Sequence, residues 1–169
     1  REPTGEFGGN LQVNLGNYNL RTAKASLDLP RFGIASISLT ARKENRDGTT
    51  DTTAGSSVAE LDDRDSTTAR VAMNLDFTDD FQIAYRFDYS DIDQTPLHSY
   101  LSRANPAVLP FLQPFVTHER SERVSIDGPT FDRSKVYGHA LTASWNINDT
   151  NTLKSITSHR KVEWSDALD

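Results

Sequence analysis

The chain has 169 residues, with 18 Lys and Arg against 24 Asp and Glu, so its formal net charge is −6. A negative chain without a basic block disfavours nucleic-acid binding, because neutralising phosphates requires clustered Lys and Arg. The absence of cysteine excludes disulfides, thiol catalysis and thiolate zinc sites. No stretch approaches the roughly 20 apolar residues of a membrane-spanning helix.

Alternation of apolar and polar residues predicts β-strands along most of the chain. Between Thr67 and Phe77, for example, one face carries Val71 and Met73 while the other carries Arg70 and Asn74. We expect seven strands, each antiparallel to its sequence neighbours, near residues 9–15, 18–29, 34–44, 67–77, 81–90, 135–147 and 152–164. The apolar face of the last strand stays open at this point, since Leu153 has one parity and Ile156, Val162 and Trp164 the other.

The expected connections alternate between short and long. Gly16-Asn17 suggests a hairpin turn, and residues 30–33, 78–80 and 148–151 have the Pro, Gly, Asn and Asp of tight turns. At Asn148 we expect the side-chain oxygen to close an Asx turn. Residues 45–66 and 91–134 are long polar connections. Such lengths without regular structure are unusual in compact domains, but outer-membrane barrels have short periplasmic turns and long extracellular loops.

These features predict an all-β fold: an antiparallel up-and-down meander that is an incomplete portion of a transmembrane β-barrel. Only helices and closed barrels satisfy every backbone polar group in a bilayer. We expect Met73, Leu75, Ile83 and Tyr85 to face lipid, and Arg70, Asn74 and Arg86 to face the lumen. Aromatic residues near the expected strand ends resemble interfacial girdles: Phe32, Phe77, Phe81 and Trp145 near the short turns, and Tyr89, Tyr137 and Trp164 near the long connections.

Five segments, in order and spacing, resemble the TonB-dependent outer-membrane receptors. They are residues 1–9, which resemble a plug-to-barrel junction, the hairpin at 15–19, a loop at 46–48 and 61–65, and a strand at 153–160 in which His159 stands where Tyr is common. The resemblance implies a barrel of about 22 strands around an N-terminal plug, with a TonB-box peptide that contacts the TonB complex. Such receptors import scarce, large ligands across the Gram-negative outer membrane.

Neither a plug nor a TonB box is recognisable, so the resemblance implies that residues 1–169 are part of the barrel wall. The start at Arg1, without an initiator Met or a signal peptide, fits a piece of a longer chain. The expected role is uptake of a ferric siderophore. The alternative is a soluble β-sandwich binding module of the carbohydrate-binding type.

The connection 91–134 is the main candidate for ligand binding, because loops on a rigid scaffold commonly carry function. Its aromatic and basic residues suit an anionic ligand such as a ferric chelate. The candidates are Tyr100, Arg103, Phe111, Phe115, His118, Arg120 and Arg123. Equally, the aromatics could serve only to pack this loop against its neighbours.

Other polar clusters have simpler interpretations. The four histidines lack ligand spacing, and the acidic residues between Glu60 and Asp65 are those of a solvated loop, so we expect no metal site. Lumen-facing cations could attract an anion, but we favour pairing with Asp28, Asp76, Asp88 or plug carboxylates. These cations are Lys24, Arg42, Arg70 and Arg86. No catalytic motif occurs, so neither enzyme activity nor a cofactor is expected.

Overall fold

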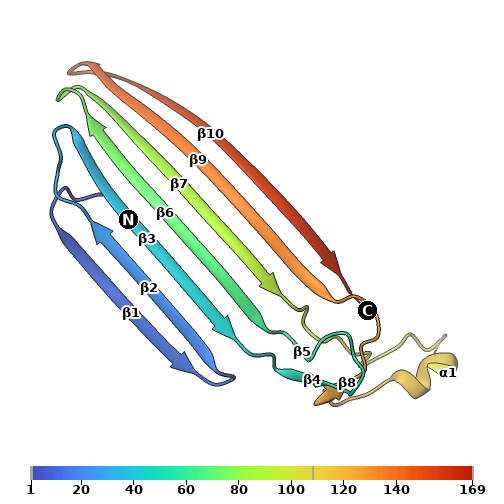
Figure 1. Cartoon of the computed structure of the whole chain (residues 1–169). Helices are drawn as coiled ribbons and strands as arrows, with labels where there is room; N and C mark the ends of the chain where they lie inside the picture. The colour runs from blue at the N-terminus through green and yellow to red at the C-terminus, as the bar shows by residue number, and fades with distance from the viewer. Residues whose placement is uncertain (1, 108, 169) are drawn as a thin grey trace.

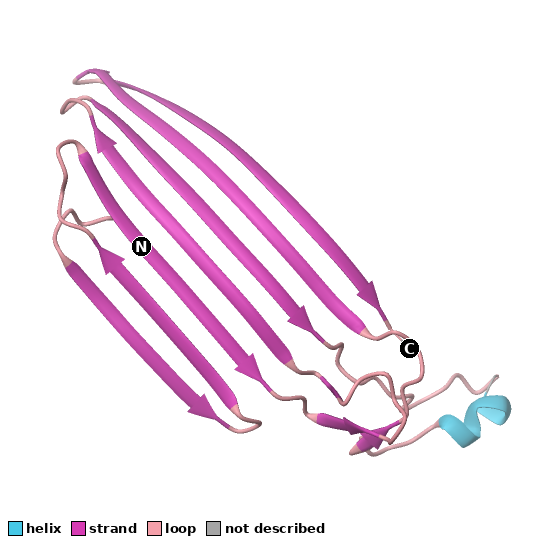
Figure 2. Ribbon diagram, in the orientation of Figure 1, coloured by secondary structure: helices cyan, strands magenta, loops and turns pink. Residues whose placement is uncertain are grey.

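The computed structural model describes residues 2–107 and 109–168, and a sheet of seven long strands dominates it (Figures 1 and 2). In spatial order the strands are β1 (Gly8–Gly16), β2 (Leu20–Asp28), β3 (Ala35–Arg46), β6 (Arg64–Asp76), β7 (Phe81–Gln94), β9 (Phe131–Asn148) and β10 (Asn151–Ala167). Every neighbouring pair is antiparallel. The sheet is open, with β1 and β10 at its edges. The predicted all-β antiparallel meander is confirmed.

The two long connections are shorter and more ordered than the sequence predicted. They contain β4 (Thr50–Thr52), β5 (Glu60–Leu61), helix α1 (Leu109–Leu112), the 3₁₀ helix η1 (Gln113–Phe115) and β8 (Arg123–Val124). The expected bounds of about 45–66 and 91–134 each extend a few residues too far. In the structure β3 and β6 remain paired as far as Arg46 and Arg64, and β7 and β9 as far as Gln94 and Asp132. Strand pairing satisfies the backbone N–H and C=O groups whichever side chains are present. Polar residues at the strand ends can therefore belong to the sheet.

The first hairpin turn lies slightly later than predicted. Tyr18 and Asn19 have φ of 56° and 52°, and the Leu20 amide donates to the Asn17 carbonyl over 3.2 Å. These angles are those of a type I′ turn, which matches the twist of the flanking strands. Of the two expected turn residues, Asn17 begins the turn, whereas Gly16 is still paired with Leu20 in the strands. The Asx turn is confirmed, since Asn148 Oδ1 accepts the Thr150 amide over 3.1 Å.

The strand register divides the sheet into an apolar and a polar face. Val71 lies opposite Phe87, and Phe87 opposite His139, so side chains of one parity form rungs across the strands. As predicted, Met73, Leu75, Ile83 and Tyr85 share the apolar face, and Arg70, Asn74 and Arg86 have the opposite parity. We call the rungs from Phe81–Trp145 to Tyr89–Tyr137 the apolar band.

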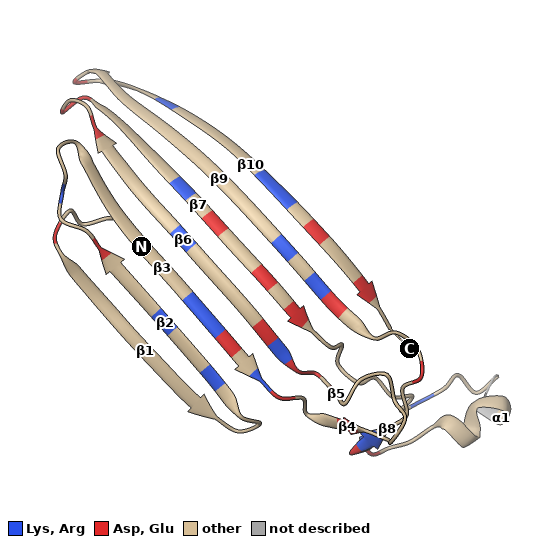
Figure 3. Cartoon of the chain, viewed as in Figure 1, with Lys and Arg blue, Asp and Glu red and all other residues tan. Residues whose placement is uncertain are grey.

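Charged rungs follow the apolar band at the end of the sheet that leads into the long connections. On the apolar-face parity, Lys43 pairs with Asp65, and two cross-strand ion pairs follow. These are Asp91–Lys135 at 3.2 Å and Asp93–Arg133 at 3.1 Å. Figure 3 shows that most charged positions of the long strands gather toward this end. The apolar band is thus bounded by ion pairs at one end and by Phe77 and Phe81 at the other.

The register also resolves the faces of β10. Leu153 lies opposite Trp145 and therefore shares the apolar face, whereas Ile156, Val162 and Trp164 have the other parity. The indole Nε1 of Trp164 donates to Asp132 Oδ1 over 2.9 Å, which anchors it on the polar face. The local pattern was ambiguous because three of the large apolar residues lie on the polar face.

No second layer covers the apolar band among the described residues. The buried apolar side chains of this part of the chain are Leu61, Ala72 and Ile126, and two of these lie in the long connections. Leu141 and Trp145, both in the band, are 43% and 48% exposed. An apolar face of this size marks an interaction surface rather than an ordinary protein exterior.

Candidate functional site

The two long connections pack together beyond the strand ends as a small cap, formed by residues 47–63 and 120–130. Within it, β4 pairs antiparallel with β5 and parallel with β8. The Thr53 amide donates to the Val124 carbonyl, and the Ser57 amide to the Ile126 carbonyl, both over 2.8 Å. Leu61 and Ile126 are buried inside the cap. Residues about 70 positions apart in sequence therefore form one ordered unit.

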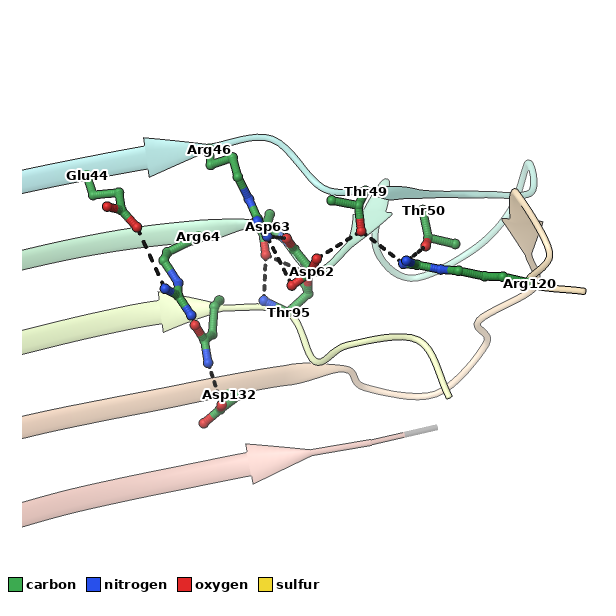
Figure 4. A network of polar contacts seen from close by, with 11 residues as sticks. Glu44, Arg46, Thr49, Thr50, Asp62, Asp63, Arg64, Thr95, Arg120 and Asp132 are labelled. Carbon is green, nitrogen blue, oxygen red and sulfur yellow. Dashed lines mark hydrogen bonds and ion pairs between the residues drawn. The ribbon is translucent and has the colours of Figure 1, made fainter. Parts of the chain in front are cut away.

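Arg120 joins the halves of the cap (Figure 4). Its Nη2 donates to the hydroxyl oxygens of Thr49 and Thr50 over 2.9 and 2.7 Å. The Thr49 hydroxyl donates in turn to Asp62 Oδ2 over 2.8 Å, and Asp62 Oδ1 pairs with Arg46 over 3.0 Å. Because Thr50 is only 2% exposed, its hydroxyl has little access to water as an alternative partner. Arg120 thus has a structural position, within a polar chain that reaches the end of β3.

A second polar contact fixes the cap to the ends of β6 and β7. Asp63 Oδ1 accepts hydrogen bonds from the amide and the hydroxyl of Thr95, both over 2.5 Å. The Asp62 amide donates to the Pro96 carbonyl over 3.1 Å. The carboxylates of Asp62, Asp63 and Asp65 therefore each have a protein partner, which for Asp65 is Lys43. The described residues hold no group of three or more metal-ligating side chains.

Residues 97–107 and 109–119 project from the cap as a separate segment (Figure 1). At its base the Thr117 amide donates to the Leu101 carbonyl over 2.9 Å. Phe111 and Phe115 are 79% and 69% exposed, so in this conformation neither ring is packed against a neighbouring loop. Tyr100 is also exposed and stacks on His98, with 6.2 Å between ring centroids. The segment therefore presents aromatic surface to solvent.

The seven predicted ligand-binding residues are divided between these two parts. Arg120 and Arg123 belong to the cap, where Arg123 Nη2 lies 3.6 Å from Asp51 Oδ2. Tyr100, Phe111 and Phe115 lie on the projecting segment. Arg103 and His118 lie on it as well, and both are exposed. Within the described residues, neither makes a hydrogen bond or an ion pair. The structure does not bring the seven together into one cluster.

The four predicted lumen cations lie on the polar face, but the expected pairing with Asp76 and Asp88 is wrong, and pairing with plug carboxylates stays a prediction. Arg42 pairs with Glu44 on its own strand, and Arg86 pairs with Glu2 of the N-terminal segment. Asp88 pairs with Arg160 instead, and Asp76 pairs with Arg31. In a strand, residues i and i+2 share a face, so Glu44 lies closer to Arg42 than the acids considered from the sequence.

Sequence analysis missed Glu2, Thr49, Thr50 and Lys154 as residues of interest. Glu2 and Arg86 are 84 positions apart, and Arg120 and Thr49 are 71 apart. Nothing in the local pattern of any of them signals these contacts. They depend on which distant segments the fold brings together, which a residue's own neighbours in sequence do not specify.

Comparison of the chain with models of protein families, with curated proteins and with solved structures finds no match. In the described residues, no helix has the length and apolar character needed to cross a membrane.

Proposed function

We propose that the chain forms part of the wall of an outer-membrane TonB-dependent receptor. This receptor imports a scarce, large ligand, best matched by a ferric siderophore, with energy from the inner-membrane TonB complex. One observation carries the proposal: an uncovered apolar band on one face of an antiparallel meander, bounded by aromatic residues. A closed barrel of such strands exposes this face to lipid and its polar face to a wet lumen.

The dimensions of the band support a membrane location. Eight residues separate Phe81 from Tyr89, which corresponds to about 26 Å along a strand. A tilt of about 40° reduces this to about 20 Å across the membrane, near the roughly 25 Å apolar band of outer-membrane barrels. The rings of Phe77 and Phe81 lie 5.6 Å apart, and those of Tyr89 and Tyr137 lie 5.2 Å apart. Both pairs sit where interfacial girdles would be.

The ends of the sheet support an orientation. The connections at 29–34, 77–80 and 149–150 are short, and the cap and its projecting segment lie at the opposite end. Barrels of this kind have long loops outside the cell. In this orientation the charged rungs face the lipid headgroups, and the exposed aromatics of residues 97–119 meet the ligand first. Arg103 and His118 are positioned to attract an anionic chelate.

The N-terminal segment fits a chain that reaches the wall from the lumen. Glu2 lies on the polar face, where its carboxylate pairs with Arg86 and accepts a hydrogen bond from Asn74 over 3.4 Å. A plug inside the barrel would deliver the chain to this face.

The alternative, a soluble β-sandwich, requires a second sheet packed on the apolar face. The second sheet of the described residues, β5-β4-β8, lies at the strand ends instead. We therefore favour the membrane wall.

Adjacent cysteines on opposite faces test the membrane location. The chain has no cysteine, so Leu141→Cys and Thr142→Cys can each carry one environment-sensitive fluorophore. In lipid vesicles, we expect quenchers on the acyl chains to quench the label at residue 141 and to leave the label at 142 bright. Equal quenching, or the reverse order, would contradict the proposed wall.

Uptake tests the receptor role separately. Cells that express the full-length protein are expected to accumulate a labelled ferric siderophore, and matched cells without a functional TonB complex are not. Uptake that persists without the TonB complex would contradict a TonB-dependent role.

A further inference from the structure

The polar face contains a hollow of about 470 Å³ between β6 and β10. Its floor has small side chains, Ala84, Ala140 and Thr142, which leave space between longer neighbours. Arg70, Arg86 and Lys154 stand around it. The hollow is remote from the projecting segment, because Lys154 lies near the short turn at 149–150.

The charges around the hollow are unevenly matched. Neither Arg70 nor Lys154 makes a hydrogen bond or ion pair with any described residue. Asp76, which also lines the hollow, pairs with Arg31 over 3.1 Å. The remaining acid is Glu2, whose side chain is 76% exposed. Arg70 and Lys154 are therefore two cations of the hollow without an acidic partner among the described residues.

Glu2 shows which chemistry the hollow accepts. Its carboxylate pairs with Arg86 Nη2 and accepts from Asn74 Nδ2, although Glu2 belongs to none of the strands. The other guanidinium nitrogen of Arg86, Nη1, donates to the Met73 carbonyl over 3.0 Å, which holds the side chain in place. A carboxylate thus already occupies one part of the hollow, while Arg70 and Lys154 remain available.

We propose that this hollow binds a small polycarboxylate and that Glu2 competes with the ligand for Arg86. Four residues along β7 separate the rung of Arg86 from that of Gln82, which aligns with Ser144 and Lys154. This separation is about 13 Å along the strands. One carboxylate cannot serve both positions, but a molecule with several carboxylates can bridge the long side chains of Arg86 and Lys154, with Arg70 one rung beyond Arg86 at the far side of the hollow. The site goes beyond the proposed transport role and does not depend on membrane insertion.

Calorimetric titration of the full chain in detergent micelles tests the site. The probe is tricarballylate, a tricarboxylate, and acetate is the monovalent control. We expect Arg70→Gln and Lys154→Gln each to weaken tricarballylate binding about two- to five-fold, as exposed charge pairs do. Glu2→Gln removes the competing carboxylate and is expected to tighten binding by a similar factor. Acetate, which has one carboxylate, should bind Arg70→Gln, Lys154→Gln and the unchanged chain alike.

Lys24→Gln is the matched control, because Lys24 lies on the polar face without a partner among the described residues and outside the hollow. We expect it to leave binding unchanged. Equal weakening by Lys24→Gln and Lys154→Gln would reduce the effect to general surface charge and overturn the proposal. Absence of binding in both the unchanged chain and Glu2→Gln would also overturn it. If a Gln variant fails to fold, Lys154→Arg, which keeps the charge, must retain binding.

Discussion

Asp88 on β7 and Arg160 on β10 form an ion pair across the strand that separates them. Arg160 Nη2 lies 3.0 Å from Asp88 Oδ2, and the residue of β9 between them is Gly138. The contact is possible because Gly138 has no side chain: a Cβ there would lie 2.6 Å from the Asp88 carboxylate oxygens. One glycine therefore lets three strands share a single ion pair.

Gly138→Ala is expected to displace the Asp88 carboxylate and break this pair. The pair is partly exposed, so its loss costs less than 1 kcal/mol, and we expect about 1–2 kcal/mol in total once overpacking is included. Urea unfolding in detergent measures the change. Gly8→Ala is the control, since no atom lies within 4 Å of its added Cβ. Equal stability of the two variants would show that the pair adjusts without cost.

An arginine substituted into the apolar band should destabilise the protein in a bilayer, and more so the nearer it lies to the bilayer midplane. Leu141 lies opposite Tyr85, midway between Phe81 and Tyr89. We expect Leu141→Arg to lower the free energy of unfolding in lipid vesicles by about 2–4 kcal/mol. Leu75→Arg, one rung nearer the short turns, should cost less. Thr142→Arg, on the polar face, should cost least, and the opposite order would place the faces the other way round.

Arg120 should hold the first connection against the second. Arg120→Ala leaves the buried Thr50 hydroxyl without its partner, at a cost of about 1–2 kcal/mol. Hydrogen exchange should then be faster by roughly ten-fold in residues 47–63 and unchanged in β7. Arg103→Ala is the matched control on the projecting segment, where no such effect is expected. Protection unchanged in Arg120→Ala would remove its role in the cap.

Shortening the projecting segment should separate ligand binding from assembly. The contact between Leu101 and Thr117 closes the base of the segment, so a short Gly-Ser link can replace residues 102–116. We expect heat-modifiable gel mobility and surface expression to persist, since exposed loops contribute little to stability. Siderophore affinity should fall by about ten-fold or more, because the exposed aromatic residues of the segment are removed. Deleting 100–125 instead would remove Arg120 and β8 as well, and should also loosen the cap. Unchanged affinity after the shorter deletion would exclude the segment from ligand binding.

The strands were predictable because period-two patterning and turn residues are local properties. From Ala69 to Asp76, apart from Ala72, the residues alternate between apolar and polar in sequence as they alternate between the faces of the sheet. The exact ends of the strands were harder to predict. From sequence Asp91 and Asp93 resemble loop residues, but β7 continues through both, because Lys135 and Arg133 lie opposite them on β9. Their charges are compensated across the strands, and only the register shows this.

The position of the candidate residues in a long connection was predictable, but their division between the cap and the projecting segment was not. Tyr100 and Phe111 were identified correctly as lying in a long connection, but the sequence could not separate Arg103 from Arg120. Both are arginines in a polar stretch with aromatics. Only Arg120 meets Thr50, from a connection about 70 residues earlier, and no local pattern specifies that meeting.

The pairing of each long strand with its sequence neighbours has a consequence for assembly. Each strand forms after one partner already exists, so the sheet can grow hairpin by hairpin in the order of synthesis. Short separations between paired strands keep the entropic cost of each addition low. Addition of β6 and of β9 costs the most entropy, because these strands pair with β3 and β7 across connections of about 17 and 36 residues. Arg120 links those same connections, so its side chain can meet Thr49 and Thr50 only once the β3–β6 and β7–β9 hairpins have brought both connections to the same end of the sheet.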